Sequence, residues 1–387
     1  MSPILPYELH PLIIQKARGK SSLLSLSLCC SSFRDVAQSI LFQYPAGIST
    51  PDQQHSLIHS IISSPERLGP MVRIFICCYG KESPDVPGGT YHEVATALRA
   101  MSNLKQLVLS DASRYPPTIL DGCTFHLETF HVAMQSGINA FLTHFLPTQP
   151  DLKHLGIDTD VAMDSDGGSV GSDEWFDTEE DSDDGSTDSE PEPDGPLVVP
   201  PDICPHLESL DGAPYNVMVF FADGRPIKRL DWNDINLPPA FPPITQFPLE
   251  YLKISPTLLS WGGRISYGAT MNSLVTLELV AAVPITERMI PNYVAFMSRI
   301  PTLRVLILSS HRRDNWSQSI IQRIFEQCQT LQHIDLQYSL SGTVFKRFFP
   351  PKVDGQMEQK VVNLADVYRG VSWMEDKYSY LEYRNAV

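Results

Sequence analysis

The chain has 387 residues, of which 42% are hydrophobic, enough to bury a sizeable core beside a smaller domain. It carries 29 Lys and Arg against 45 Asp and Glu, a formal net charge of −16, so we expect no basic surface for nucleic acid. Neither a signal peptide nor an apolar run of about 18 residues is evident, so we expect no membrane segment and a cytoplasmic or nuclear location.

Residues 1–47 predict a module of three short helices. Pro6 suits the first turn of the first helix, although a start at Pro11 is the alternative. Ser21 is a candidate cap for the second helix, and Ser32 is the candidate N-cap of the third. The third helix carries the clearest apolar stripe, made of Phe33, Val36, Ala37, Ile40, Leu41 and Tyr44.

The residues of this module carry a resemblance. Its segments are Leu5-Pro6-x-Glu8-Leu9, Ile13-Ile14, Leu24-x-Leu26-x-Leu28-x-Cys30-x-Ser32-Phe33-Arg34 and Ile40-Leu41-Phe42, and together they resemble an F-box. Members of that family dock onto the Skp-type adaptor of a cullin-based ubiquitin ligase. The adaptor-binding residues that the resemblance implies are Leu5, Pro6, Leu9, Ile13, Leu24, Leu28, Cys30 and Phe33. The alternative is a generic three-helix cap that covers the end of the following domain.

A repeated apolar pattern dominates the rest of the chain, with the form apolar-x-x-apolar-x-apolar. It recurs ten times, at Met71-Ile74-Ile76, Leu104-Leu107-Leu109, Leu127-Phe130-Val132, Leu152-Leu155-Ile157, Leu207-Leu210, Ile227-Leu230-Trp232, Leu249-Leu252-Ile254, Leu274-Leu277-Leu279, Leu303-Leu306-Leu308 and Leu331-Ile334-Leu336. The last six starts are separated by 20, 22, 25, 29 and 28 residues. Helical patterns at 92–101, 290–300 and 320–328 run directly into the next strand pattern, as parallel strands require.

This period and pattern resemble leucine-rich repeats over about residues 70–345. The resemblance implies an α/β fold in which the F-box module is followed by an irregular leucine-rich-repeat solenoid with parallel strands. Each repeat is degenerate, because the turn position usually held by Asn or Cys is occupied by Ala112, Gln135, Asp160, Thr257, Ala282, His311 and Ser339. The alternative is an ordinary α/β domain whose strands share a buried-leucine pattern.

An acidic segment interrupts the repeats. Residues 158–194 hold 16 Asp and Glu and no Lys or Arg; removing these 16 from the total of 45 leaves 29, equal to the basic residues. Such a segment favours a disordered loop. We therefore expect a helical module at 1–47, repeats at 48–157, an acidic loop at 158–199, further repeats at 200–345 and a C-terminal cap or tail at 346–387. Aromatic residues Trp373, Tyr378, Tyr380 and Tyr383 lie in that last part.

Catalytic and metal-binding patterns are missing from the sequence. The seven cysteines include no C-x-x-C, and His126, His131, His144 and His154 match no ligand spacing. No phosphate-binding loop, G-x-S-x-G or H-E-x-x-H occurs. We expect a non-enzymatic substrate receptor without a cofactor, which binds a Skp-type adaptor, through it a cullin, and an unknown target protein. The alternatives are a leucine-rich-repeat scaffold unconnected to a ligase and a hydrolase-like α/β enzyme.

Overall fold

The fold is mixed α/β, with one twelve-stranded sheet that is parallel except for its last two strands. The computed structural model describes residues 9–17, 20–43, 45, 50–77, 89–109, 117–133, 138–158, 199–212, 217, 219–220, 225–232, 248–255, 271–281, 288–310, 317–338, 344–352 and 356–368. Of the acidic loop predicted at 158–199, residues 159–198 lie outside these ranges, as do the degenerate turn positions and the aromatic residues from 373 onward. Within the described ranges, no helix has the length and apolarity to cross a membrane.

Three helices begin the described chain: α1 Leu9–Lys16, α2 Lys20–Cys29 and α3 Ser31–Gln43. They pack through the buried side chains of Ile14, Leu23 and Ala37. Pro11 is the third residue of α1 as described, in the first turn, where a backbone N–H has no helical acceptor. Proline is therefore compatible with this helix.

A second group of three helices joins this module to the sheet, namely α4 Pro51–Ser63, α5 Pro65–Leu68 and the short helix η1 Gly69–Met71. The start of α4 is fixed by a capping box, in which the Thr50 hydroxyl accepts from the Gln53 backbone and the Gln53 side chain accepts from the Thr50 backbone. Leu57, Ile58 and Ile61 of α4 belong to the main core. The sequence patterns did not predict this helix.

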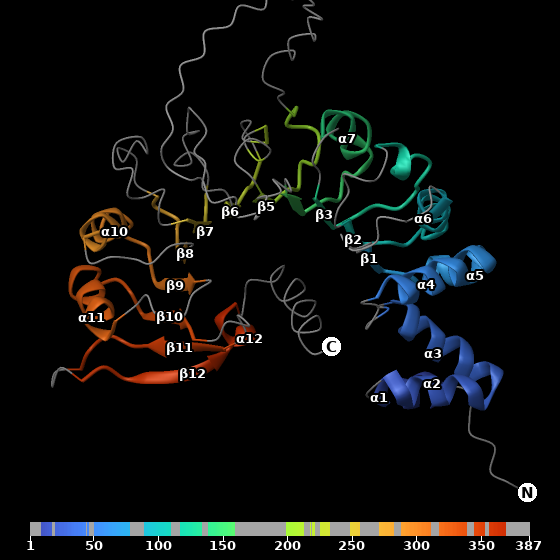
Figure 1. Ribbon diagram of the computed structural model, residues 1–387, viewed down its shortest axis with the longest axis horizontal. Coiled ribbons are helices and arrows are strands. Elements are labelled where there is room, and N and C mark those ends of the chain that lie inside the picture. Colours follow the sequence, from blue (N-terminus) through green and yellow to red (C-terminus); the bar gives the residue numbers. More distant parts are fainter. Residues whose placement is uncertain are drawn as a thin grey trace, which may run out of the picture.

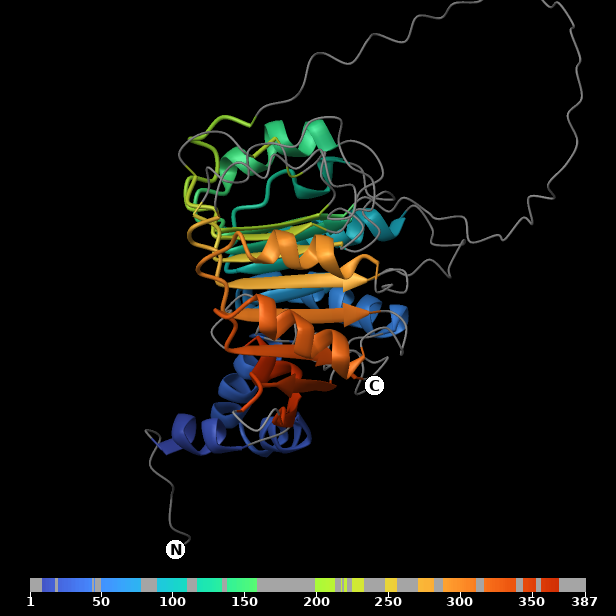
Figure 2. The same ribbon diagram turned by 90° about the vertical axis from the view of Figure 1, so that its left-hand side faces the viewer.

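Ten parallel strands follow the chain order, and each pairs with its neighbours in sequence. They are β1 Ile74–Cys77, β2 Gln106–Leu109, β3 Thr129–Ala133, β4 His154–Asp158, β5 Ser209–Gly212, β6 Arg229–Trp232, β7 Tyr251–Ile254, β8 Thr276–Ala281, β9 Val305–Ser310 and β10 His333–Gln337. One strand coincides with each of the ten predicted patterns. The strands are stacked in an arc (Figure 1) and run side by side in the same direction (Figure 2).

Helices lie on the outer side of the arc, where Figure 1 labels α6, α7, α10 and α11. Their bounds are α6 Gly89–Ala100, η3 Pro117–Leu120, α7 Ile138–His144, η4 Leu146–Thr148, α10 Ile290–Met297 and α11 Gln318–Gln327. The helices expected at 92–101, 290–300 and 320–328 are confirmed as α6, α10 and α11. Their apolar faces bury the outer side of the sheet.

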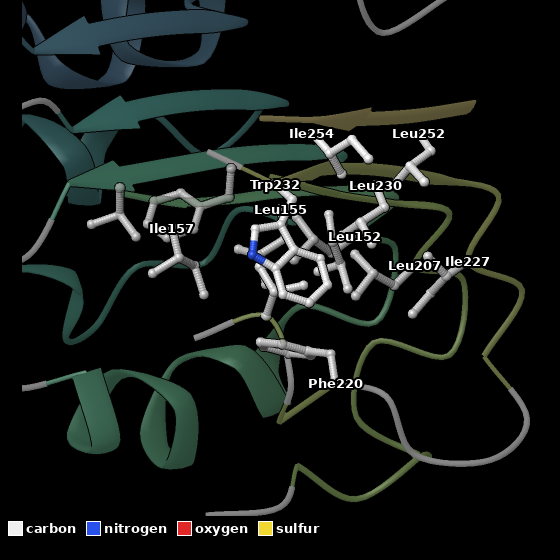
Figure 3. Packing of buried hydrophobic residues seen from close by; sticks show 14 of the residues in the cluster. Leu152, Leu155, Ile157, Leu207, Phe220, Ile227, Leu230, Trp232, Leu252 and Ile254 are labelled. Atoms are coloured by element: carbon white, nitrogen blue, oxygen red, sulfur yellow. The ribbon is translucent and has the colours of Figure 1, made fainter. Parts of the chain in front are cut away.

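The main core runs between the strands and these helices. Leucines at equivalent positions pair in register from strand to strand, so that Leu155 lies beside Leu210 and Leu210 beside Leu230. Figure 3 shows Trp232 packed beside Leu155 and Leu230, with Phe220 facing it from a connecting segment. All five side chains are buried. Each strand therefore buries its apolar side chains against its neighbours, and the core continues from one strand to the next.

The register expected for the first strand is wrong by one residue. Phe75 and Cys77 of β1 are buried and Phe75 pairs with Leu107, whereas Ile74 and Ile76 are only partly buried on the opposite face. The reason is that this strand is apolar on both faces, so alternation in the sequence does not select which face is the core.

The sheet ends in a strand pair of opposite direction. Strands β11 Val344–Phe348 and β12 Gln359–Asn363 run antiparallel, and β12 leads directly into the short helix α12 Leu364–Val367. Figure 1 shows α12 on the inner side of the arc. There Val367 and Tyr368 join a second cluster with Tyr251 and Ile307, separate from the main core.

Charged residues of alternating sign mark the edge where the strands begin. The series is Lys105, Glu128, Lys153, Glu208, Lys228 and Glu250, and the backbone N–H of each residue after the first donates to the carbonyl of the one before it. The N–H of Lys105 donates to the Arg73 carbonyl. The carboxylate of Glu128 lies 3.5 Å from Lys105 Nζ and 3.1 Å from Lys153 Nζ. The hydrogen bond from Lys153 lowers the pKa of Glu128. Successive strands thus enter the sheet with compensating charges.

Candidate protein-docking site

The helical module exposes an unusual amount of apolar surface. The described chain has eight exposed large apolar side chains, and five of them belong to α1 and α2. These five form what we call the module patch: Leu9 (40% exposed), Leu12 (56%), Ile13 (38%), Leu24 (47%) and Leu28 (84%). Five exposed apolar side chains within two short helices of one module are typical of a protein-interaction surface, whereas scattered single ones need no explanation.

The patch is additional to the internal core of the module. The side chains that hold the three helices together are Ile14, Leu23 and Ala37, with Phe33 and Val36 packed against them. Thus α2 has buried Leu23 next to exposed Leu24. The apolar side chains of this helix extend beyond the face that packs inside the module. A helix of this kind has apolar surface left for a partner.

The predicted adaptor-binding residues fall into three groups. Leu5 and Pro6 lie outside the described residues. Leu9, Ile13, Leu24 and Leu28 belong to the module patch, and Cys30 is exposed directly after α2. Phe33 differs, because it is partly buried against the module's core. Leu12 of the patch was missed, although its spacing of three from Leu9 on a helix was a usable signal.

The module is joined to the sheet through α3. Arg67 Nη1 donates to Gln38 Oε1 at 2.7 Å, and the Arg73 N–H donates to the Gln43 carbonyl at 3.1 Å. Phe42 packs against the main core. The patch on α1 and α2 therefore lies beyond these contacts, outside the core of the sheet.

The inner face of the sheet is polar and unusually rich in buried charge. Asp211, Asp231, Lys253 and Glu278 are neighbours in register on four successive strands, and Asp335 continues the row beyond Ile307. The four carboxylates are at most 4% exposed. Buried charges of this kind need partners, because desolvation is otherwise costly.

Hydrogen bonds and ion pairs hold these carboxylates in place. Lys253 Nζ lies 2.7 Å from Asp231 Oδ2. Glu278 accepts from the hydroxyls of Tyr251 at 2.6 Å, Tyr368 at 2.8 Å and Ser309 at 2.9 Å. Because Tyr368 follows α12, Glu278 ties the C-terminal segment to the inner face.

Asp335 and Arg347 form a second, bidentate anchor. Arg347 Nε and Nη2 each donate to Asp335 at 2.7 Å, and Nη2 also donates to the Asp366 carbonyl at 3.2 Å. Burial alone would raise the pKa of Asp335, but the hydrogen bonds from Arg347 and His333 outweigh burial and lower it. The hydrogen bond to Asp335 raises the pKa of Arg347. The pair is charged and geometrically fixed.

The four histidines do not form a common centre. His131 and His154 lie on the inner face of β3 and β4, while His126 and His144 are exposed elsewhere. Burial, together with the charges of Arg229 and Lys153, lowers the pKa of His154 to about 4. Within the described ranges, no three His, Cys, Asp or Glu side chains gather as a metal site requires.

No protein-family model and no curated protein matches the chain. The geometry combines a helical module with surplus apolar surface and a curved sheet whose inner charges are held in fixed positions.

Proposed function

We propose that this chain is the substrate-receptor subunit of a Skp–cullin–F-box ubiquitin ligase. The helical module binds a Skp-type adaptor and, through it, a cullin, and the inner face of the strand array holds a target protein. The chain contributes position and no chemistry, because holding the target beside a bound enzyme raises its effective concentration.

The observation that carries this proposal is the module patch. Four of its five residues, Leu9, Ile13, Leu24 and Leu28, are positions that the F-box resemblance implies for adaptor contact. Their exposure in the free chain supports a partner that covers them, since hot spots of protein interfaces are apolar groups that become desolvated on binding.

The strand array supports the second half of the proposal. Ten parallel strands in chain order, each beginning after a buried Leu or similar residue, agree with a leucine-rich-repeat architecture. The inner face presents partly exposed side chains from successive strands, such as Arg229 and Lys253, at a regular spacing. Such a surface recognises a protein by side-chain complementarity across several repeats.

Leu28→Asp tests the adaptor site. The side chain is 84% exposed, so the change should leave folding intact while placing a charge in an apolar interface. We expect affinity for a purified Skp-type adaptor, measured by calorimetry, to fall by at least about tenfold. Val361→Asp is the matched control, because Val361 is 64% exposed on β12 and outside the module, and its affinity should match the parent chain.

Two results would contradict the proposal: no adaptor binding by the parent chain, or equal loss in both variants. A parent chain that captures a target protein but no adaptor is a scaffold unconnected to a ligase.

A further inference from the structure

A pocket of about 330 Å³ opens on the inner face near the C-terminal end of the array. Its walls come from β8, β9, β10, β11, β12 and α12. Three basic side chains line it, His333, Arg347 and Lys360, against one carboxylate, Asp366. Asp335 does not line the pocket, because it is fully buried and bound by Arg347.

Arg347 is held ready for a ligand. Its Nε and Nη2 are committed to Asp335 and to the Asp366 carbonyl, and its side chain is 18% exposed. Within the described part of the chain, nothing accepts a hydrogen bond from Nη1. A guanidinium already fixed by a carboxylate loses little conformational entropy when it donates to a ligand.

Lys360 adds a second positive charge that the fold itself does not use. Arg347 and Lys360 are directly opposed partners across β11 and β12, and like charges in that position are destabilising. No carboxylate of the described residues lies within 4.0 Å of Lys360 Nζ. A ligand that places an anionic group between the two side chains relieves this repulsion.

Apart from Thr276, the remaining walls are apolar. Ile307 of β9, Val362 of β12 and Val367 of α12 are buried and face the pocket beside the basic side chains. The volume accommodates a few amino-acid side chains and exceeds the needs of a small inorganic anion. The site therefore suits an anionic group attached to an apolar segment.

We propose that this pocket binds a carboxylate carried on an apolar segment of the target protein, either an acidic side chain or a chain terminus. Arg347 and Lys360 take the carboxylate, and Ile307, Val362 and Val367 contact the neighbouring apolar side chains. This inference rests on the proposed function in one respect, which is that the ligand belongs to a target protein. It does not depend on adaptor binding, which the proposed function assigns to α1 and α2.

The test uses the full chain and three pools of fluorescent hexapeptides, read by fluorescence anisotropy. The first pool has apolar residues around one Glu and blocked ends, the second has Gln in place of Glu, and the third lacks Glu but has a free C-terminal carboxylate. We expect the first or third pool to bind at least about tenfold more tightly than the second. Tighter binding of the first pool identifies the ligand as an acidic side chain, and tighter binding of the third pool identifies it as a chain terminus.

Lys360→Gln should weaken binding of the carboxylate pool by about tenfold, while keeping the exposed strand intact. Lys352→Gln is the matched control, because Lys352 is an exposed lysine just after β11 that does not line the pocket, and its binding should be unchanged. If neither carboxylate pool binds more tightly than the Gln pool, or if the two variants have equal effects, the proposal is overturned. Displacement by inorganic phosphate as effective as by acidic peptide would also overturn it. Adaptor affinity, measured on the same samples, shows separately whether the proposed function holds.

Discussion

At the scale of single residues, His154 couples the fold to pH. Its side chain lies on the inner face of β4, and the positive charges of Arg229 and Lys153 act on it together with burial. The folded pKa of about 4 lies below the ordinary value of 6.5. Between these two values the unfolded chain binds a proton that the folded chain excludes, so the free energy of unfolding falls as the pH decreases.

We predict that lowering the pH from 7 to 4.5 destabilises the parent chain through His154, by up to about 3 kcal/mol. His154→Gln should remove this part of the pH dependence, because glutamine does not titrate. Urea denaturation at a series of pH values measures it. Asp335 affects stability in a separate pH range. Because its pKa is lowered, its contribution to the free energy of unfolding is lost only below about pH 4. Parallel pH profiles for parent and variant would show that His154 is not the responsible group.

At the scale of elements, strand β2 tests the alternation on which the fold depends. Leu107 is fully buried between β1 and β3, whereas its neighbour Gln106 is only partly buried on the inner face. Leu107→Ala should reduce the free energy of unfolding by about 2–5 kcal/mol, because it leaves a cavity. Gln106→Ala should cost less than about 0.5 kcal/mol. Chemical denaturation compares them, and equal losses would be incompatible with the alternating strand.

The ten parallel strands were predictable because a pattern of apolar residues at a fixed spacing, most of them leucines, marks each strand in the sequence itself. The register of β1 was not predictable, since Ile74 and Ile76 on one face are as apolar as the buried Phe75 and Cys77 on the other. The module patch was largely predictable, because the F-box resemblance indicates four of its five residues and leaves out only Leu12. The pocket was not predictable, because Arg347 and Lys360 meet only through the antiparallel pairing of β11 and β12.

At the scale of the whole molecule, strands β4 and β5 pair directly although a long stretch of sequence separates them. Leu155 lies in register with Leu210, and Val199 and Cys204 are buried before β5 begins. The strand pairing is thus continuous across the long stretch of sequence between β4 and β5.

We predict that replacing residues 160–194 with a short Gly/Ser linker leaves the melting temperature and the adaptor affinity unchanged. Loop length has only a small effect on closure entropy, which supports this expectation. Differential scanning calorimetry and the adaptor titration measure both quantities. A drop in melting temperature of more than a few degrees would mean that the acidic segment contributes to the folded core.

The alternating charges at the strand-entry edge bear on how such a chain can lengthen during evolution. Duplicating a single repeat between Glu128 and Lys153 sets two like charges side by side, whereas duplicating two consecutive repeats preserves the order of signs. Exposed pairs of this kind contribute less than about 1 kcal/mol each, so the preference acts as a weak bias. Growth in steps of two repeats is therefore the route that this edge favours.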